Sequence, residues 1–197
     1  PFLTDDAKRA ALQHQQPGYY YARRSHSSGN QLIEHLREII PSASSVTLMP
    51  NGLSACLSAL KAVVPTGGTL VYDKHIYYEV ERGLIEIAMS RNWNLVAGDF
   101  TDTPLLSGAI AGLAAPVHAF YCDNPRNWWL DSLDIHKLAQ LASDFRARLI
   151  VDTSVQPIQD PLSEGADICV MSLSKYPSLG LTLGGAIFTN DVVIDDL

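Results

Sequence analysis

Apolar and polar positions along the chain follow two different periods. Short, nearly continuous apolar runs predict strands over residues 45–49, 69–72, 93–97, 117–121, 148–151, 168–172 and 184–189. Apolar residues that recur every three or four positions predict helices over residues 31–40, 52–64, 77–90, 104–113 and 133–145. Residues 1–29 carry no sustained apolar period, so we expect an arm there.

Strands and helices alternate through the whole predicted pattern. This order is typical of βαβ units with right-handed crossovers, in which helices of about ten to fifteen residues cover both faces of a parallel sheet. The sequence therefore predicts an α/β fold with three layers and a mostly parallel central sheet. We expect an N-terminal arm and helix over residues 1–44 and one large domain over residues 45–197.

Polar clusters follow the predicted strands at their carboxyl ends. These clusters are Asn51-Gly52, His75–Tyr77, Asp123-Asn124, Asp152–Ser154 and Ser172–Lys175. Ligands of parallel α/β sheets bind at this edge. We therefore expect one site built from several strand ends.

Lys175 ends the most informative of these clusters. The apolar strand over residues 168–171 leads into two hydroxyls, Ser172 and Ser174, and then into this lysine. A lysine becomes a nucleophile toward a carbonyl when burial or a neighbouring cation lowers its pKa. We therefore expect a buried amine that serves an aldehyde cofactor, of which pyridoxal phosphate (PLP) is the common case. A surface lysine at the end of a strand is the other interpretation.

Asp152 and Asn51 suggest contacts with two other parts of such a cofactor, its ring nitrogen and its phosphate. Asp152 follows a buried strand and needs a cation, which a protonated pyridine nitrogen supplies, or else a helix to cap. Asn51, Gly52 and Leu53 open a helix directly after a strand, where unpaired N–H groups attract phosphate. The same Asn-Gly pair is also common in ordinary turns.

Two further side chains fit a planar ring with a phenolate oxygen. Tyr77 can stack on such a ring, although a core tyrosine is equally compatible with the sequence. Asn124 can donate a hydrogen bond to the oxygen, although Asn-Pro also marks a plain turn.

Composition excludes several classes of function. A net charge of −7 and only 14 Lys and Arg leave no basic face for nucleic acid. The histidines and cysteines show no metal-ligand spacing, and no apolar run reaches the length of a membrane helix. Three scattered cysteines in apolar segments indicate reduced thiols and a cytoplasmic protein. The start at Pro1 and the end at Leu197 suggest a piece of a longer chain.

The motifs together resemble the cystathionine synthase/lyase group of fold-type I PLP enzymes, the Cys/Met-metabolism family. The matching segments, in the family's order and spacing, are Tyr21–Arg23, Asn51–Leu53, Tyr77, Asp123–Pro125, Val151–Ser154 and Ser172–Tyr176. They cover nearly the whole chain. The resemblance implies the large PLP-binding domain of this fold.

The resemblance also implies a role for each site residue. Lys175 would form the internal aldimine and act as base, while Tyr77 would stack on the ring and assist proton transfer. Asp152 would pair with the pyridine nitrogen. The remaining cofactor contacts would come from Asn51, Gly52, Leu53, Asn124, Ser154, Ser172 and Ser174. Tyr21 and Arg23 would reach the phosphate of a neighbouring subunit, which implies a homodimer or homotetramer.

Three departures from the family pattern concern substrate choice and the arm. Tyr78-Glu79-Val80 stands where many relatives have Gly-Gly-Thr or Gly-Cys-Thr, which puts a bulky ring and an acid on the substrate side. His26-Ser27-Ser28 replaces Asn-Pro-Thr in the arm. The family's small C-terminal domain, with its carboxylate-binding arginine, has no counterpart before Leu197, so we expect that domain to be absent.

The implied function is a PLP-dependent lyase or transferase that acts on a small sulfur-containing amino acid, by β/γ-elimination or γ-replacement on a cystathionine- or methionine-type substrate. An aminotransferase, or a decarboxylating or racemising relative, would use the same Lys175 and Asp152. A degenerate PLP domain that serves as a scaffold is a further alternative. A nucleotide-binding Rossmann domain is disfavoured because no G-x-G-x-x-G follows the first strand.

Overall fold

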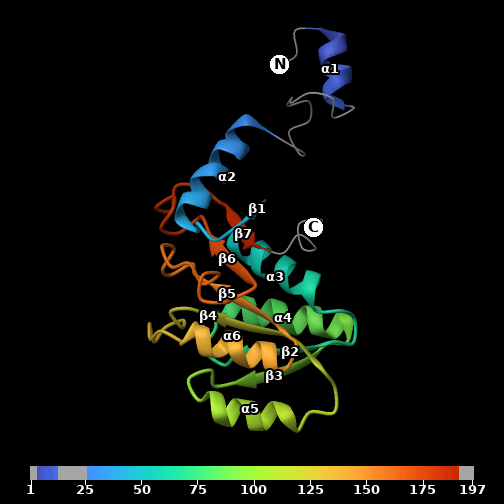
Figure 1. Ribbon diagram of the computed structural model, residues 1–197, viewed down its shortest axis with the longest axis vertical. Coiled ribbons are helices and arrows are strands. Elements are labelled where there is room, and N and C mark those ends of the chain that lie inside the picture. Colours follow the sequence, from blue (N-terminus) through green and yellow to red (C-terminus); the bar gives the residue numbers. More distant parts are fainter. Residues whose placement is uncertain (1–3, 13–25, 191–197) are drawn as a thin grey trace.

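The computed structural model describes residues 4–12 and 26–190 (Figure 1). The helices of this part are α1 (Asp5–Leu12), α2 (Ser27–Ile39), α3 (Gly52–Val63), α4 (Tyr78–Arg91), α5 (Thr103–Ala111) and α6 (Ile135–Asp144). The strands are β1 (Ser45–Met49), β2 (Thr69–Asp73), β3 (Asn94–Gly98), β4 (Val117–Asp123), β5 (Arg148–Asp152), β6 (Ile168–Ser172) and β7 (Gly185–Thr189).

The strands form one mixed sheet in the order β1-β7-β6-β5-β4-β2-β3. Strand β7 runs antiparallel to both of its neighbours, β1 and β6, and all other pairs are parallel. The direction of β7 follows from its connection, because a loop over residues 173–184 joins it to β6 without a crossover helix. The prediction of a mostly parallel sheet is confirmed.

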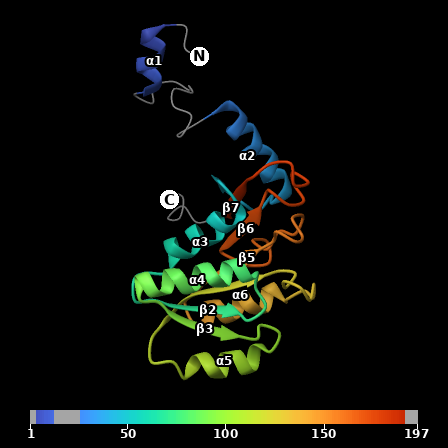
Figure 2. The same ribbon diagram turned by 180° about the vertical axis from the view of Figure 1, so that it is seen from behind.

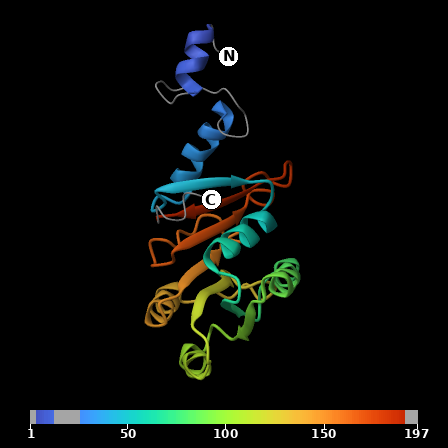
Figure 3. The same cartoon turned by 90° about the vertical axis from the view of Figure 1, so that its right-hand side faces the viewer.

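Helices cover both faces of the sheet and form a separate core on each. One core packs α3 and α4 against residues such as Tyr121 and Ile150, and the other packs α2, α5 and α6 against residues such as Phe120 and Leu149. These pairs of neighbours on β4 and β5 face opposite sides because side chains alternate along a strand. Figure 3 shows the sheet with α3 and α4 on one side and α5 and α6 on the other.

The carboxyl ends of β2, β4, β5 and β6 meet at one edge of the sheet, with Asp73, Asp123, Asp152 and Ser172 as their last residues. The first residue of β7, Gly185, pairs with Ser172 and with Met49 at the end of β1, so it also lies at this edge. The edge expected from the sequence therefore exists and gathers the predicted polar clusters.

The N-terminal region contains more helix than the sequence pattern predicts. Helix α1 lies within the expected arm, and its acidic first turn (Asp5, Asp6) and basic last turn (Arg9) suit the helix dipole. Helix α2 begins at Ser27, earlier than expected, because the His26 side chain accepts a hydrogen bond from the Ser28 N–H and caps a polar first turn. The apolar period used for the prediction does not detect such polar starts.

Candidate active site

Helix α3 begins at the carboxyl edge and presents its first N–H groups there. The Asn51 side chain caps the helix by accepting a hydrogen bond from the Ser54 N–H at 2.8 Å. The preceding N–H groups, those of Gly52 and Leu53, have no partner within the helix because they lie in its first turn. This arrangement favours an anion at the start of α3.

The start of α3 packs closely against the ends of two strands. A Cβ atom on Gly52 would lie 2.6 Å from the Cβ of Ser172, and one on Gly185 would collide with the backbone of Asn51. Both positions therefore require glycine for the close approach of backbone to neighbour. The result is a narrow junction in which the α3 N-terminus and Ser172 lie side by side.

Asp152 lies at the end of β5 with its carboxylate buried, at 7% exposure. Its Oδ1 accepts a hydrogen bond from the Ser154 N–H at 2.7 Å, and its Oδ2 accepts one from the Cys56 thiol at 3.1 Å. The Ser154 hydroxyl oxygen in turn accepts the Ser172 N–H at 2.7 Å. Ser154 therefore joins the ends of β5 and β6 behind the carboxylate.

Asp123 pairs with Asp152 in register at the end of β4. Its Oδ2 accepts the Tyr77 N–H at 2.8 Å, so this carboxyl group holds the backbone of Tyr77 in place. Burial, helped by the nearby Asp152 carboxylate, raises the pKa of Asp123 to about 8. The edge thus contains two adjacent carboxyl groups in different environments.

Tyr77 and Lys175 meet across the site. The Lys175 Nζ lies over the Tyr77 ring, 5.0 Å from its centroid, within the range of a cation–π contact. Lys175 is exposed, however, so the expectation of a buried amine is wrong for the part of the chain that the structure describes. Lys175 is exposed because it lies in the loop after β6. Other side chains of this loop are exposed as well, namely Tyr176, Leu179 and Leu181.

Ser174 and Asn124 are engaged by the chain itself. The Ser174 hydroxyl donates to the Gly184 carbonyl at 3.2 Å and accepts the Gly184 N–H at 3.0 Å. The buried Asn124 amide donates to Gln159 at 3.0 Å and accepts the Leu133 N–H at 2.8 Å. In this structure both side chains stabilise loops at the carboxyl edge of the sheet through these hydrogen bonds. Their predicted contacts with a cofactor remain predictions, and Tyr21 and Arg23 lie outside the described residues.

Two residues that the sequence analysis missed, Cys56 and Tyr121, lie beneath Asp152. Tyr121 Oη is 3.4 Å from Asp152 Oδ2 and 3.5 Å from Cys56 Sγ. Spacing offered a signal for both, since Cys56 follows Gly52 by four positions on a helix and Tyr121 precedes Asp123 by two on a strand. Each therefore shares a face with a residue of the edge.

The loop after β4 is anchored by Arg126, whose side chain is 10% exposed. It forms ion pairs with Asp131 and, at 3.3 Å, with Asp99. Its Nη1 also lies 3.9 Å from Asp73, which is fully buried at the end of β2 and whose pKa burial raises. This loop adjoins the site because the Asn127 N–H donates to the His75 carbonyl.

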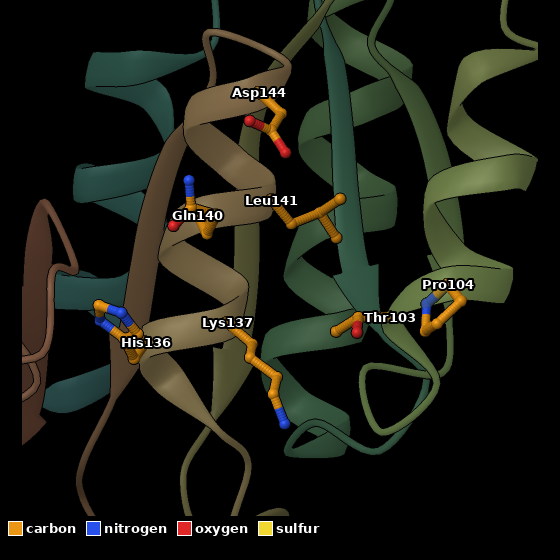
Figure 4. A pocket seen from close by; sticks show the side chains of 7 residues that line it. All are labelled: Thr103, Pro104, His136, Lys137, Gln140, Leu141 and Asp144. Atoms are coloured by element: carbon orange, nitrogen blue, oxygen red, sulfur yellow. The ribbon is translucent and has the colours of Figure 1, made fainter.

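Two clefts lie away from Asp152. Figure 4 shows a shallow one of about 310 Å³ between α5 and α6, lined by Thr103, Pro104, His136, Lys137, Gln140, Leu141 and Asp144. The other, of about 300 Å³, separates α2 from the loop over residues 173–184, which lie side by side in Figures 1 and 2. Its lining is mainly apolar and includes Leu32, Leu36 and Leu183.

Within residues 4–12 and 26–190, no cluster of three or more His, Cys, Asp or Glu side chains has a geometry suited to a metal ion. In the same ranges, no helix combines the length and the apolar character needed to cross a bilayer.

The fold and the edge together define a class of protein. A mostly parallel sheet between two helical layers carries a lysine, an aromatic ring, a buried carboxylate and a capped helix N-terminus at one edge. The chain belongs to the Cys/Met metabolism PLP-dependent enzyme family, whose sequence profile matches residues 1–196. The family resemblance and the α/β fold class expected from the sequence are confirmed, and PLP is the cofactor of this family.

Relatives with assigned activities are similar over most of the chain. This chain is 29% identical over 184 residues to a cystathionine gamma-synthase of Mycobacterium tuberculosis, and the match covers 91% of this chain and 46% of the relative. It is 26% identical to an L-methionine gamma-lyase of Fusobacterium nucleatum, covering 100% and 50%.

A solved structure has the same fold. The cystathionine gamma synthase of Xanthomonas oryzae, in complex with aminoacrylate and cysteine, superposes with a TM-score of 0.83 at 25% identity, covering 92% of this chain and 46% of that one. The chain therefore spans about half the length of the proteins that it matches.

Proposed function

We propose that this chain forms the cofactor-binding part of a PLP-dependent enzyme that acts on a small sulfur-containing amino acid. The observation that carries the proposal is the meeting of Lys175 and Tyr77, 5.0 Å apart, at the edge where Asp152 and the α3 N-terminus also lie. A primary amine, an aromatic ring, a carboxylate and an anion-binding helix end are the groups that a phosphorylated pyridine aldehyde requires.

The residues present fit the cofactor in charge and shape. The unpaired N–H groups at the start of α3 suit a phosphate, and the junction between Gly52 and Ser172 places a hydroxyl next to them. Asp152 offers an anionic oxygen with fixed orientation, since both of its oxygens accept hydrogen bonds from the chain. The pyridine ring of the cofactor supplies an electron sink when the cofactor is bound.

Each residue then has a definite task. Lys175 would hold the aldehyde carbon through Nζ, and its free amine would be the base at the substrate Cα. Asp152 would hold a proton on the ring nitrogen, and Tyr77 would orient the ring by stacking. Tyr77 keeps its place because its N–H donates to Asp123.

The relatives favour elimination or replacement at the β or γ position over transamination. Both assigned relatives carry names of thioether chemistry, cystathionine gamma-synthase and methionine gamma-lyase. We propose the same substrate class, a thioether amino acid, for the protein that carries this chain. Tyr78 and Glu79, which stand at the start of α4, are then the residues that distinguish its substrate from theirs.

Assembly and location are further parts of the proposal. A homodimer or homotetramer would cover the exposed Lys175 with a second subunit. A cytoplasmic location agrees with three free, buried cysteines, Cys56, Cys122 and Cys169.

The test is cofactor attachment to one lysine. We expect the purified protein, mixed with PLP, to gain a visible absorbance band, and borohydride reduction followed by peptide mass spectrometry to find the pyridoxyl group on Lys175. Lys175→Ala should abolish both signals. Lys137→Ala, an exposed position of α6, is the matched control and should keep both.

A second assay addresses the reaction. Loaded protein should release a thiol and an α-keto acid from cystathionine or methionine. Attachment of the pyridoxyl group to another lysine, or a protein that PLP cannot colour, contradicts the proposed cofactor site. Amino-group transfer to an α-keto acid without thiol release contradicts the proposed substrate class.

A further inference from the structure

A short loop after β4 exposes three consecutive apolar side chains beside the candidate site, and the proposed function uses none of them. Trp128, Trp129 and Leu130 are 79%, 68% and 63% exposed. Their loop, which runs from Arg126 to Asp131 between β4 and α6, projects from the carboxyl edge of the sheet in Figure 1. Single apolar side chains are common on a protein surface, but three in succession at a candidate site require a reason.

The backbone of this 126–131 loop is strained where it carries these side chains. Trp128 and Leu130 have φ angles of 67° and 57°, in the left-handed region that residues other than glycine rarely adopt. Neither side chain is buried, so burial does not offset the cost of this conformation. Strain of this kind persists only where surrounding contacts fix the backbone, and it is concentrated at functional sites.

Hydrogen bonds within the loop fix this conformation. The Arg126 N–H donates to the Asp131 carbonyl at 3.0 Å and closes the loop at its base, while the Leu130 N–H donates to the Arg126 carbonyl at 3.0 Å. The Arg126 guanidinium also pairs with the Asp131 carboxylate, with Nε 3.0 Å from Oδ1. The loop is therefore a firm support, and Trp129 lies between its two left-handed residues.

Trp129 contacts His75 from this position. Its indole Nε1–H donates to His75 Nδ1 at 3.2 Å, and the two rings meet edge to face with their centroids 5.8 Å apart. An indole N–H only donates, so Nδ1 is the acceptor and carries no hydrogen. The neighbouring Asn127 N–H donates to the His75 carbonyl at 3.1 Å. The loop thus holds both the ring and the backbone of His75.

His75 belongs to the segment of residues 74–77, which connects β2 to α4 and ends in Tyr77. The Tyr77 N–H donates to Asp123 Oδ2 at 2.8 Å, and the Asn127 side chain donates to the same carboxyl group. The 126–131 loop therefore reaches the backbone of this segment at two points, directly at His75 and through Asp123 at Tyr77. The Trp129–His75 contact adds a link between side chains.

We propose that Trp129 and His75 are positioning residues that hold the 74–77 segment in place, so that the Tyr77 ring is already oriented before a cofactor binds. The effect on catalysis rests on the proposed function, because only a bound pyridine ring makes use of an oriented Tyr77. The contact between Trp129 and His75, and its effect on the 74–77 segment, are properties of the cofactor-free chain.

Hydrogen exchange of the cofactor-free chain tests this contact directly. Trp129→Phe keeps an aromatic ring but loses the donor, and His75→Ala loses the acceptor. Each should speed exchange of the Tyr77 and Asn127 amides by about two- to ten-fold, because the loss of one hydrogen bond favours local opening of the segment. His75→Asn places an acceptor oxygen close to the position of Nδ1 and should restore slow exchange.

Two controls separate positioning from a general loss of stability. Trp128→Phe changes the other tryptophan of the loop, which is 79% exposed, whereas the indole bound to His75 is that of Trp129, so exchange at Tyr77 should stay as in wild type. The Thr153 amide, which donates to a carbonyl of β6 at 3.0 Å, is the reference within each variant. Its exchange should not change in Trp129→Phe or His75→Ala.

Two outcomes of the exchange measurement overturn the proposal. One is wild-type exchange at Tyr77 and Asn127 in both Trp129→Phe and His75→Ala. The other is an increase at Thr153 equal to that at Tyr77, which would show that the whole domain is destabilised and that the segment is not specifically held. If Trp129→Phe fails to fold, His75→Ala and His75→Asn decide the question.

PLP binding gives a second readout. A Tyr77 ring that must be ordered on binding costs affinity, so Trp129→Phe and His75→Ala should raise the PLP dissociation constant by about three- to ten-fold. His75→Asn and Trp128→Phe should leave it near the wild-type value. Wild-type protein that shows the expected exchange but binds no PLP refutes the proposed function alone. Unchanged PLP affinity in both Trp129→Phe and His75→Ala refutes the positioning of Tyr77 alone.

Discussion

At the scale of single residues, Gly52 is the position where the site depends most on a missing side chain. A methyl group there would lie 2.6 Å from the Ser172 Cβ, so Gly52→Ala should lower the free energy of unfolding by about 1–3 kcal/mol in urea denaturation. Gly108→Ala is the control, since that glycine is in α5 with open space around it, and should gain about 0.5–1 kcal/mol. Equal effects of the two substitutions would contradict the close packing at the α3 N-terminus.

Asp123 should make stability depend on pH. Its pKa is near 8 in the folded chain and has its ordinary low value in the unfolded chain, so between about pH 4 and pH 8 the folded state binds the extra proton. Stability therefore falls as the pH rises through this window, by roughly 1 kcal/mol per pH unit for one proton. Below the window Asp123 adds no penalty, and above pH 8 its penalty is complete.

Asp123→Asn removes that titration, so the variant should gain stability relative to wild type as the pH rises from 5 to 8. Urea unfolding at several pH values measures the difference. Asp144→Asn, at an exposed position of α6, controls for the loss of one negative charge. A constant difference between Asp123→Asn and wild type across this range would refute a protonated Asp123.

Single residues also show how far sequence reasoning reaches. Asp152, Tyr77 and Lys175 were found because each lies in a polar cluster at or shortly after the end of a predicted strand, where ligands of parallel sheets bind. The exposure of Lys175 was not predicted, because it depends on which segments cover the loop after β6. Cys56 and Tyr121 were missed because their contacts with Asp152 join segments distant in the chain and apolar in pattern.

At the scale of elements, the apolar period located every strand of the described sheet and all helices except α1. Buried strands and helices with one apolar face leave clear signals. The direction of β7 leaves no such signal, because a run of buried residues reads the same in either direction and only the 173–184 loop decides it. Helix α1 was missed because it has only eight residues and begins with two acidic ones. Its sequence gives charge signals typical of a helix start but too little apolar periodicity.

The loop after β4 should depend on one ion pair that is largely buried. Arg126→Met leaves Asp73 buried without its nearby cation and should cost about 3 kcal/mol of unfolding free energy. Arg82→Met removes a largely exposed arginine from its pairs with Glu79 and Glu86 and should change stability by less than about 1 kcal/mol. Urea unfolding of the two variants provides the comparison. Equal costs would show that Arg126 does not anchor this loop.

At the scale of the whole molecule, the described fold places its candidate cofactor contacts on segments far apart in sequence. These segments are the start of α3, the loop before α4 and the loop after β6. They meet because the strand order places β1, β7 and β6 on one side of β5 and places β4 and β2 on its other side. Any ligand that contacts all three segments must therefore stabilise the folded state as a unit. The chain spans about half the length of its relatives. Stabilisation of this chain by a ligand therefore tests directly whether it binds that ligand without the rest of the protein.

PLP at a concentration 100-fold above its dissociation constant should raise the free energy of unfolding by about 2.7 kcal/mol, through preferential binding to the folded state. For a domain of this size that corresponds to a rise in melting temperature of about 5–10 °C. Pyridoxamine phosphate keeps the ring and the phosphate but cannot bond to Lys175, and pyridoxal lacks the phosphate, so at equal concentration each should stabilise less than PLP. Differential scanning fluorimetry with these ligands and with sodium phosphate separates the contributions. Equal stabilisation by PLP and by sodium phosphate would reduce the site to the anion-binding end of α3 and remove Lys175 from it.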